Sequence, residues 1–224
     1  MKVLRERGGA WQLVAGATTA AILAIAFLVT ARSAPSGAAA VTIGARPSIA
    51  GPDQPVTLFG SVSSGRPGET VDIQSKDCGQ TFFRTVSGTH SQSGGRWATD
   101  FFPSIGTQVR AVWKGQRSRA VPVGQRAMIR FVPKASDRTR FVVSIVGRAQ
   151  FWRRMVVIER LHRRSWERYR TVVLTEQEAP GEFVWTSAEF RARLPRGTML
   201  RAVLPQSQAG PCYLFSLSLP LRTG

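Results

Sequence analysis

The sequence predicts an all-β protein built as two tandem antiparallel β-sandwiches, preceded by one apolar N-terminal helix. Three observations predict it: a β-pattern that occurs twice, short alternating runs bounded by turn residues, and an uncharged segment near the N-terminus. Hydrophobic residues make up 43% of the 224-residue chain, which argues against a disordered protein and supplies each half with the apolar surface of a core.

The repeat is the strongest of these observations. Its two copies keep an almost constant offset, which widens only at the end of the pattern. Residues 56–62 align with 141–147, 71–74 with 156–159, 84–89 with 170–175 and 106–112 with 197–203. The units that the repeat defines have a size that suits β-sandwiches, which have ~100 residues. We therefore expect a leader or anchor over residues 1–40, a first sandwich over 41–125 and a second over 126–224.

The N-terminal segment predicts export. Residues 1–7 are basic, and residues 11–30 form a run without a charge, long enough for a membrane-spanning helix of ~20 residues. Ala38-Ala39-Ala40 provides a signal-peptidase type of cleavage site. Two interpretations remain open: a cleaved signal peptide, or an uncleaved helix that holds the protein in the membrane through residues 11–30. Both place the rest of the chain outside the cytoplasm, secreted or membrane-anchored, because the basic residues precede the span.

Short alternating runs recur at fairly regular intervals between Gly, Pro and Ser, which is typical of sandwich strands. The segment 151–166 is charged enough to suggest a helix, but its β-branched residues at 156–158 favour a strand. The strands expected in the first unit are 42–43, 56–62, 70–76, 82–89, 96–101, 108–113 and 119–123. Those expected in the second are 128–131, 140–147, 155–162, 166–174, 183–189, 199–205 and 213–219.

Several motifs carry a resemblance to known modules. They are Val56-x-Leu58-x-Gly60-x-Val62, Gly68-Glu69-x-Val71-x-Ile73, Cys78-Gly79, Gly95-Arg96-Trp97, Thr107-x-Val109-Arg110-Ala111, Arg201-Ala202-x-Leu204 and the segment 208–214. Through them, residues 41–224 resemble tandem immunoglobulin-like or fibronectin-type-III-like modules of exported, actinobacterial-type proteins. The resemblance implies β-sandwiches without a catalytic centre or a cofactor. The chain departs from antibody domains, because neither unit holds two Cys, so their inter-sheet disulfide is not expected.

Two cysteines, Cys78 and Cys212, lie in different units. An even number of Cys in an exported protein favours a disulfide, and we expect a bridge that joins the two sandwiches. Two unpaired thiols, or intermolecular bridges, remain the alternatives. A native Cα–Cα distance beyond about 7 Å would argue against the bridge.

The net charge of +18 reflects 31 Lys and Arg against 13 Asp and Glu. Strongly basic proteins bind nucleic acid, anionic lipid or acidic polymers. The positive residues comprise 27 Arg and 4 Lys, and Asn is absent, a bias that a GC-rich genome produces without selection for binding. Nucleic acid is not the expected partner, because the sequence carries no recognisable nucleic-acid-binding module.

Two basic-aromatic segments are the candidate binding residues: Phe151, Trp152, Arg153 and Arg154 in one, and Arg163, Arg164 and Trp166 in the other. Exposed aromatic and Arg side chains are enriched in binding hot spots, although core packing of the aromatic residues remains the alternative. The expected partner is an anionic envelope polymer or a protein, because guanidinium groups pair with phosphates and carboxylates.

Catalysis is not expected. The two histidines, His90 and His162, lack the ligand spacing of a zinc site, and the sequence has no G-x-S-x-G nucleophile motif. The sequence thus predicts an exported, non-catalytic structural or binding protein without a cofactor. Two other classes remain open. A carbohydrate-binding or adhesin module predicts coplanar, exposed Trp or Tyr on one sheet face, and a secreted hydrolase predicts a cleft with converging His and carboxylate.

Overall fold

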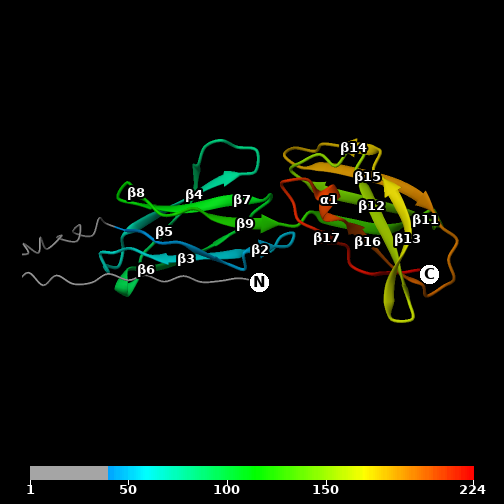
Figure 1. Ribbon diagram of the computed structural model, residues 1–224, viewed down its shortest axis with the longest axis horizontal. Coiled ribbons are helices and arrows are strands. Elements are labelled where there is room, and N and C mark those ends of the chain that lie inside the picture. Colours follow the sequence, from blue (N-terminus) through cyan, green and yellow to red (C-terminus); the bar gives the residue numbers. More distant parts are fainter. Residues whose placement is uncertain (1–39) are drawn as a thin grey trace, which may run out of the picture. The chain divides into compact units, whose positions relative to one another are not determined.

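The computed structural model describes residues 40–224, which form two β-sandwiches (Figure 1). The predicted N-terminal helix, its span at residues 11–30 and most of the expected cleavage motif lie outside the described residues. Among residues 40–224, no helix combines the length and the apolarity that a membrane span requires. The prediction of an all-β chain with antiparallel sheets is confirmed for this part of the protein.

The first sandwich packs a three-stranded sheet against a six-stranded one. One sheet has the order β1–β3–β6, and the other has the order β2–β9–β7–β4–β5 with β8 beside β7. The strands are β1 Gly44–Arg46, β2 Ile49–Ala50, β3 Val56–Ser61, β4 Thr70–Asp77, β5 Arg84–His90, β6 Arg96–Phe101, β7 Thr107–Trp113, β8 Gln116–Arg117 and β9 Val121–Gln125, with a 3-10 turn at Ser93–Gly95.

The second sandwich packs a four-stranded sheet, β10–β11–β15–β14, against a five-stranded sheet, β13–β12–β16–β17, in which β18 also pairs with β16. Its elements are β10 Met128–Lys134, β11 Asp137–Gly147, β12 Met155–His162, β13 Ser165–Val173, β14 Glu176–Glu178, β15 Val184–Arg191, β16 Met199–Leu204, α1 Gln206–Ala209, β17 Ser216–Leu217 and β18 Leu221–Arg222.

Both strand orders are immunoglobulin-like. In that fold, strands B and E share one sheet while C, F and G share the other. The first sandwich matches this with β3 and β6 in one sheet and β4, β7 and β9 in the other; the second matches it with β11 and β15 against β12, β16 and β17. The expected resemblance to immunoglobulin-like sandwiches therefore holds at the level of strand order.

Each sandwich has its own core, which follows from strict alternation along its central strands. In β7, for example, Val109, Ala111 and Trp113 face inward while the residues between them face out. The first core is completed by residues such as Leu58, Val71, Ile73 and Trp97. The second core includes the stacked rings of Phe131, Phe141 and Phe190 together with Val143, Ile145, Ile158 and Leu200.

The internal repeat extends to irregularities of the sheets. The ladder between β4 and β5 contains a bulge between Ile73 and Gln74. The ladder between β12 and β13 contains one between Ile158 and Glu159. These two positions correspond to each other in the alignment of the repeat. The equivalent strands of the two sandwiches therefore contain a β-bulge at the same position.

Most predicted strands exist, and two of them, Arg96–Phe101 and Met155–His162, have the predicted bounds. Five short strands, β1, β2, β8, β14 and β18, were not predicted, because two or three residues carry no readable alternation. The expected strand at 42–43 is wrong, since the first strand begins at Gly44. The last strand was predicted too long: within residues 213–219, Ser216–Leu217 pairs with β16, and Leu214 forms an isolated bridge with Arg126.

Candidate functional site: an arginine-rich end of the second sandwich

The first predicted binding segment divides between core and surface. Phe151 is only 1% exposed and packs against the Tyr213 ring, with centroids 5.5 Å apart. For Phe151 the structure shows core packing, the alternative that the sequence left open, because its ring closes the core of the second sandwich. Trp152 is 48% exposed and Arg153 and Arg154 are exposed beside it.

This segment forms a tight turn before β12. The Arg154 amide donates to the Phe151 carbonyl at 2.9 Å, and the Arg153 amide donates to the Leu174 carbonyl at 3.0 Å. The turn thus lies at the start of β12, whereas Arg163 and Arg164 follow its end. A strand of this length spans about 23 Å at ~3.3 Å per residue. The structure therefore does not bring the two predicted segments together.

Arg163 and Arg164 form the two-residue tip of the β12–β13 hairpin, because His162 pairs directly with Ser165. Both have positive φ angles, 46° and 71°. A two-residue hairpin loop with positive φ at both positions is a type I′ turn, which favours Asn and Gly. For a residue with a Cβ, the left-handed region costs ~1–2 kcal/mol, so the tip carries its two charges at a cost in stability.

Trp166 lies on the sheet face behind this tip. Its ring stacks under the Arg201 guanidinium, whose central carbon is 4.3 Å from the ring centroid. Trp166 is therefore partly covered by a neighbouring strand and does not belong to the hairpin tip, although both were predicted as one binding segment.

Other loops meet at the same end of the second sandwich. The end of β15 joins the β10–β11 turn, since the Ala192 amide donates to the Thr139 carbonyl at 2.8 Å. The β13 side chain of Arg170 reaches across to the Arg191 carbonyl at 2.8 Å. The start of β16 pairs with β18, where Met199 lies opposite Arg222, and its next residue Leu200 lies opposite Arg160.

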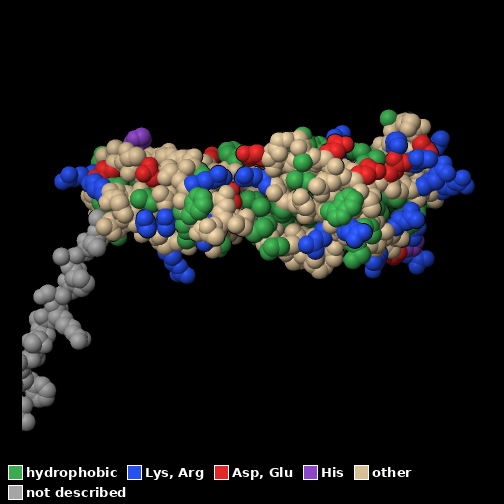
Figure 2. Space-filling model, turned by 90° about the horizontal axis from the view of Figure 1, so that it is seen from above, with side chains coloured by type: hydrophobic (Ala, Val, Ile, Leu, Met, Phe, Trp, Pro, Cys, Tyr) green, Lys and Arg blue, Asp and Glu red, His purple; other side chains and the backbone are tan. Residues whose placement is uncertain are grey.

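These loops and the strand ends beside them gather seven arginines, which we call the arginine pole: Arg138, Arg160, Arg163, Arg164, Arg193, Arg196 and Arg222. Six of them are exposed and Arg160 is part-buried. Within residues 40–224, none of the seven forms an ion pair. Figure 2 shows Lys and Arg side chains gathered at this end of the molecule, to the right of the view.

Two nearby carboxylates, those of Glu189 and Asp137, are already engaged, whereas Glu167 lies opposite Arg160 without an ion pair among the described residues. Glu189 pairs with Lys134 at 2.7 Å and with Arg140 at 2.9 Å, and hydrogen bonds from Lys134 and then Arg140 hold the pKa of Glu189 below its ordinary value. Hydrogen bonds from Thr139 lower the pKa of Asp137, which also pairs with Arg191. Both acids stay ionised and serve neighbouring cations, which leaves the pole with an unbalanced positive field.

Sequence reasoning found two of the seven pole residues, Arg163 and Arg164, and missed the other five. The missed arginines are spread over residues 138–222, and no run of adjacent basic residues marks them. A usable signal existed: in an antiparallel sandwich, alternate inter-strand loops lie at the same end, so arginines that recur in alternate loops converge.

A disulfide joins the two sandwiches at the opposite end of the second one. Cys78 directly follows β4, Cys212 precedes β17, and the structure links them with a Cα–Cα distance of 5.4 Å. The expected interdomain bridge is thus present. Between them, Gly106 accepts a hydrogen bond from the Cys78 amide and donates one to the Cys212 carbonyl. A Cβ on Gly106 would lie 2.8 Å from that carbonyl oxygen, so the position requires glycine.

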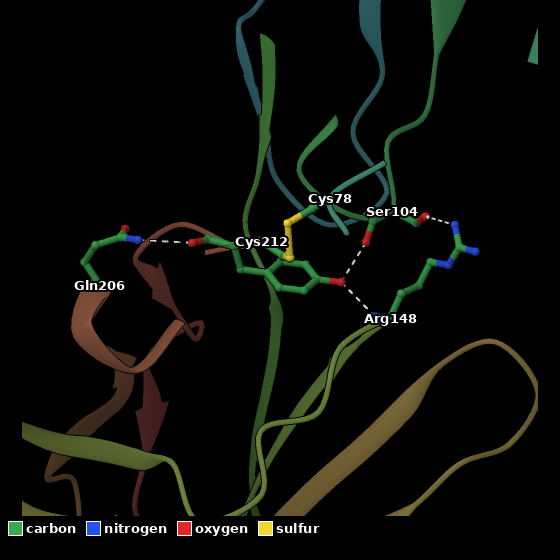
Figure 3. The surroundings of a disulfide bond; sticks show 6 residues. Cys78, Ser104, Arg148, Gln206 and Cys212 are labelled. Carbon is green, nitrogen blue, oxygen red and sulfur yellow. Dashed lines mark hydrogen bonds between the residues drawn. A yellow bond between two sulfur atoms is a disulfide. The ribbon is translucent and has the colours of Figure 1, made fainter. Parts of the chain in front are cut away.

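Hydrogen bonds among residues of both sandwiches surround the bridge (Figure 3). The buried Tyr213 hydroxyl donates to the Ser104 carbonyl at 2.8 Å and accepts from the Arg148 amide at 2.7 Å. The Arg148 guanidinium reaches Asp77 of the first sandwich at 3.1 Å. Ile105, in a loop of the first sandwich, is 6% exposed because it enters the core of the second. The joint therefore combines a covalent link, hydrogen bonds, an ion pair and apolar packing.

The structure also bears on other kinds of site. In residues 40–224, no cluster of three or more His, Cys, Asp or Glu side chains is arranged to hold a metal ion. Trp97 and Trp113 are buried, as expected for core residues. Trp152 is the exposed tryptophan of the described region, and it lies in a turn rather than on a sheet face.

No protein-family description matches the sequence, and no curated protein matches it either. Solved structures give distant likenesses. The human OSCAR ligand-binding domain covers 81% of this chain and 97% of its own, at 14% identity and a TM-score of 0.26. For a tetra-tandem repeat from the extending region of a large adhesion protein, the match covers 83% of this chain and 49% of the other, at 13% identity and a TM-score of 0.36. For a Salmonella alpha-2-macroglobulin mutant, the match covers 83% of this chain and 16% of the other, at 13% identity and a TM-score of 0.31. Likenesses this weak carry no functional argument.

Proposed function

We propose that the protein is an exported, non-catalytic binding protein that holds an anionic polymer of the cell envelope through the arginine pole. The observation that carries the proposal is the convergence of seven arginines without ion-pair partners, in the described part of the chain, on one end of a rigid sandwich. Unpaired guanidinium groups attract phosphate and carboxylate groups, and each offers several donors to them.

Backbone strain at the hairpin tip supports this function. Arg163 and Arg164 occupy the positive-φ region, where Asn and Gly are the favoured residues. Residues in unfavourable backbone conformations cluster at functional sites. Arginine at both turn positions therefore indicates that the two positive charges serve a function that outweighs the loss of folding stability.

The Cys78–Cys212 bridge supports an extracytoplasmic location, because disulfides persist in oxidising compartments and are rare in the cytosol. It lies at the end of the second sandwich opposite the pole. In this arrangement, the first sandwich and the disulfide-linked joint support the second sandwich, and the pole stays free to contact the polymer. The two histidines also fit a non-catalytic role, since His90 and His162 are both exposed and lie in different sandwiches.

The test is the affinity of the full-length protein for polyphosphate and for polygalacturonate, measured by calorimetry at several salt concentrations. Each arginine near an anionic surface contributes about 1 kcal/mol. The triple variant R163Q/R164Q/R196Q should therefore lose about 3 kcal/mol, which is about 100-fold in affinity. The loss should shrink as salt screens the charges.

A matched control removes the same net charge elsewhere. Arg66, Arg96 and Arg119 are exposed on the first sandwich and form no ion pair among the described residues. The variant R66Q/R96Q/R119Q should keep nearly the affinity of the wild type. If both triple variants lose affinity equally, the binding follows net charge alone, and the assignment to the pole is wrong.

A further inference from the structure

The two sandwiches carry the same stacked-arginine arrangement on equivalent sheet faces. In the first, Arg110 on β7 lies opposite Gln74 on β4. Its guanidinium stacks on the Phe83 ring at 4.0 Å, and its Nε donates to Gln74 Oε1 at 2.9 Å. In the second, Arg201 on β16 lies opposite Glu159 on β12, stacks on Trp166 and donates from Nε to Glu159 Oε2 at 2.6 Å.

One difference between the two arrangements concerns the side chain that accepts the hydrogen bond of the arginine. The carboxylate that neutralises Arg201 is replaced by the carboxamide of Gln74 beside Arg110. The Gln74 amide nitrogen donates to Thr85 Oγ1 at 3.3 Å, which turns the amide oxygen toward Arg110. Gln74 therefore satisfies one donor of Arg110 but leaves its charge unbalanced.

A second cation reinforces the imbalance. Lys76 occupies the position at which the second copy of the repeat has Leu161. Its Nζ is 5.3 Å from the centroid of the same Phe83 ring. Two cations thus converge on one aromatic ring. Among residues 40–224, neither Lys76 nor Arg110 has an ion-pair partner.

The remaining donors of Arg110 are available to a ligand. Its Nη1 and Nη2 groups have no acceptor within the described part of the chain, where its side-chain hydrogen bond is the one from Nε to Gln74. Desolvation lowers the pKa of Arg110, and the charge of Arg117 lowers it further. Binding of an external anion stabilises a partly desolvated guanidinium that lies beside like charges. The planar group can donate two parallel hydrogen bonds to a carboxylate.

We propose that Arg110 and Lys76 form a site for a glutamate side chain of a protein partner, on the outer face of the β4–β7 sheet of the first sandwich. The equivalent site of the second sandwich already holds a glutamate, Glu159, on its stacked arginine, so the protein itself provides the example of the ligand. This site is separate from the arginine pole and does not depend on polymer binding there.

The test uses the full-length protein in the R163Q/R164Q/R196Q background, so that the pole does not mask the site. The probe is a fluorescent peptide of alternating Glu and Gly, followed by anisotropy at physiological salt. The change Gln74→Glu copies the second sandwich and should neutralise Arg110 internally, lowering peptide affinity about tenfold or more. The reciprocal change Glu159→Gln, combined with Leu161→Lys to supply the second cation, should expose Arg201 and add a second binding equivalent.

Folding does not confound these variants, because Gln74 and Glu159 lie on outer sheet faces and Gln74→Glu should keep or raise the thermal midpoint. Arg110→Lys keeps the charge but loses the planar fork, and should weaken binding as well. Unchanged peptide affinity in Q74E would overturn the proposal, and so would the lack of a second equivalent in E159Q/L161K. If polygalacturonate binds through Arg110 and the peptide does not, the protein partner is the wrong assignment. Polymer binding by the pole should be unaffected by Q74E, so the two proposals fail separately.

Discussion

The hairpin tip offers a test that separates charge from backbone strain. We expect the double variant R163N/R164G to be more stable than the wild type. The φ angles of 46° and 71° place both arginines in the left-handed region, which costs ~1–2 kcal/mol for each residue with a Cβ. Asn tolerates this region and Gly enters it freely, while Gly adds ~0.5–1 kcal/mol of backbone entropy to the unfolded state. The net gain in the free energy of unfolding should be about 1–2 kcal/mol.

The assay is urea unfolding at neutral pH with the disulfide intact. The control R163Q/R164Q removes the same charges but keeps side chains with a Cβ at both positive-φ positions. It should unfold at a urea concentration close to that of the wild type, whereas R163N/R164G should need more urea. Both should lose the same polymer affinity, since both lack the two charges. Equal midpoints for the two variants would refute the argument that the turn is strained.

Further predictions concern the joint and the ionised groups. Replacing Cys78 and Cys212 by Ser should lower the free energy of unfolding by up to about 5 kcal/mol, since a bridge across 134 residues restricts the unfolded chain. Equal urea midpoints with and without the bridge would contradict this prediction. Ile105→Ala should cost about 2–4 kcal/mol, because the residue lies in the core of the neighbouring sandwich, and a loss below about 1 kcal/mol in the same assay would mean that the joint is loosely packed. Burial raises the pKa of Tyr213, so the folded state holds this proton more tightly than the unfolded state. The contribution of Tyr213 to the free energy of unfolding should be fully present below pH ~10 and fall as the pH rises further. Tyr213→Phe should remove most of that fall when unfolding is measured across alkaline pH. The lowered pKa of Glu189 has the opposite sign: its contribution is present above pH ~4.3 and lost as the pH falls below that value, and Glu189→Gln should make acid unfolding less steep.

The sequence alone determined the fold class and the repeat, and it limited an intramolecular disulfide to one pair. These depend on local or countable features: alternation of period two marks strands whatever they pair with, turn residues mark their ends, and a single pair of cysteines leaves one intramolecular bridge. Trp97 and Trp113 lie in the core for the same reason, since their inward phase follows from the alternation along the strand. Strands of two residues, such as Gln116–Arg117, escaped because pairing alone defines them.

The tertiary structure decided which charges meet. Arg138, Arg163, Arg196 and Arg222 are far apart in the sequence, and only the antiparallel strand order brings their loops to one end of the second sandwich. The burial of Phe151 depended on Tyr213, which lies much closer to the C-terminus. Likewise, the stacking of Arg110 on Phe83 is a cross-strand contact that no spacing within one strand reveals. Local pattern fixes which face a side chain takes, but charge balance and packing depend on neighbours that only the paired sheets supply.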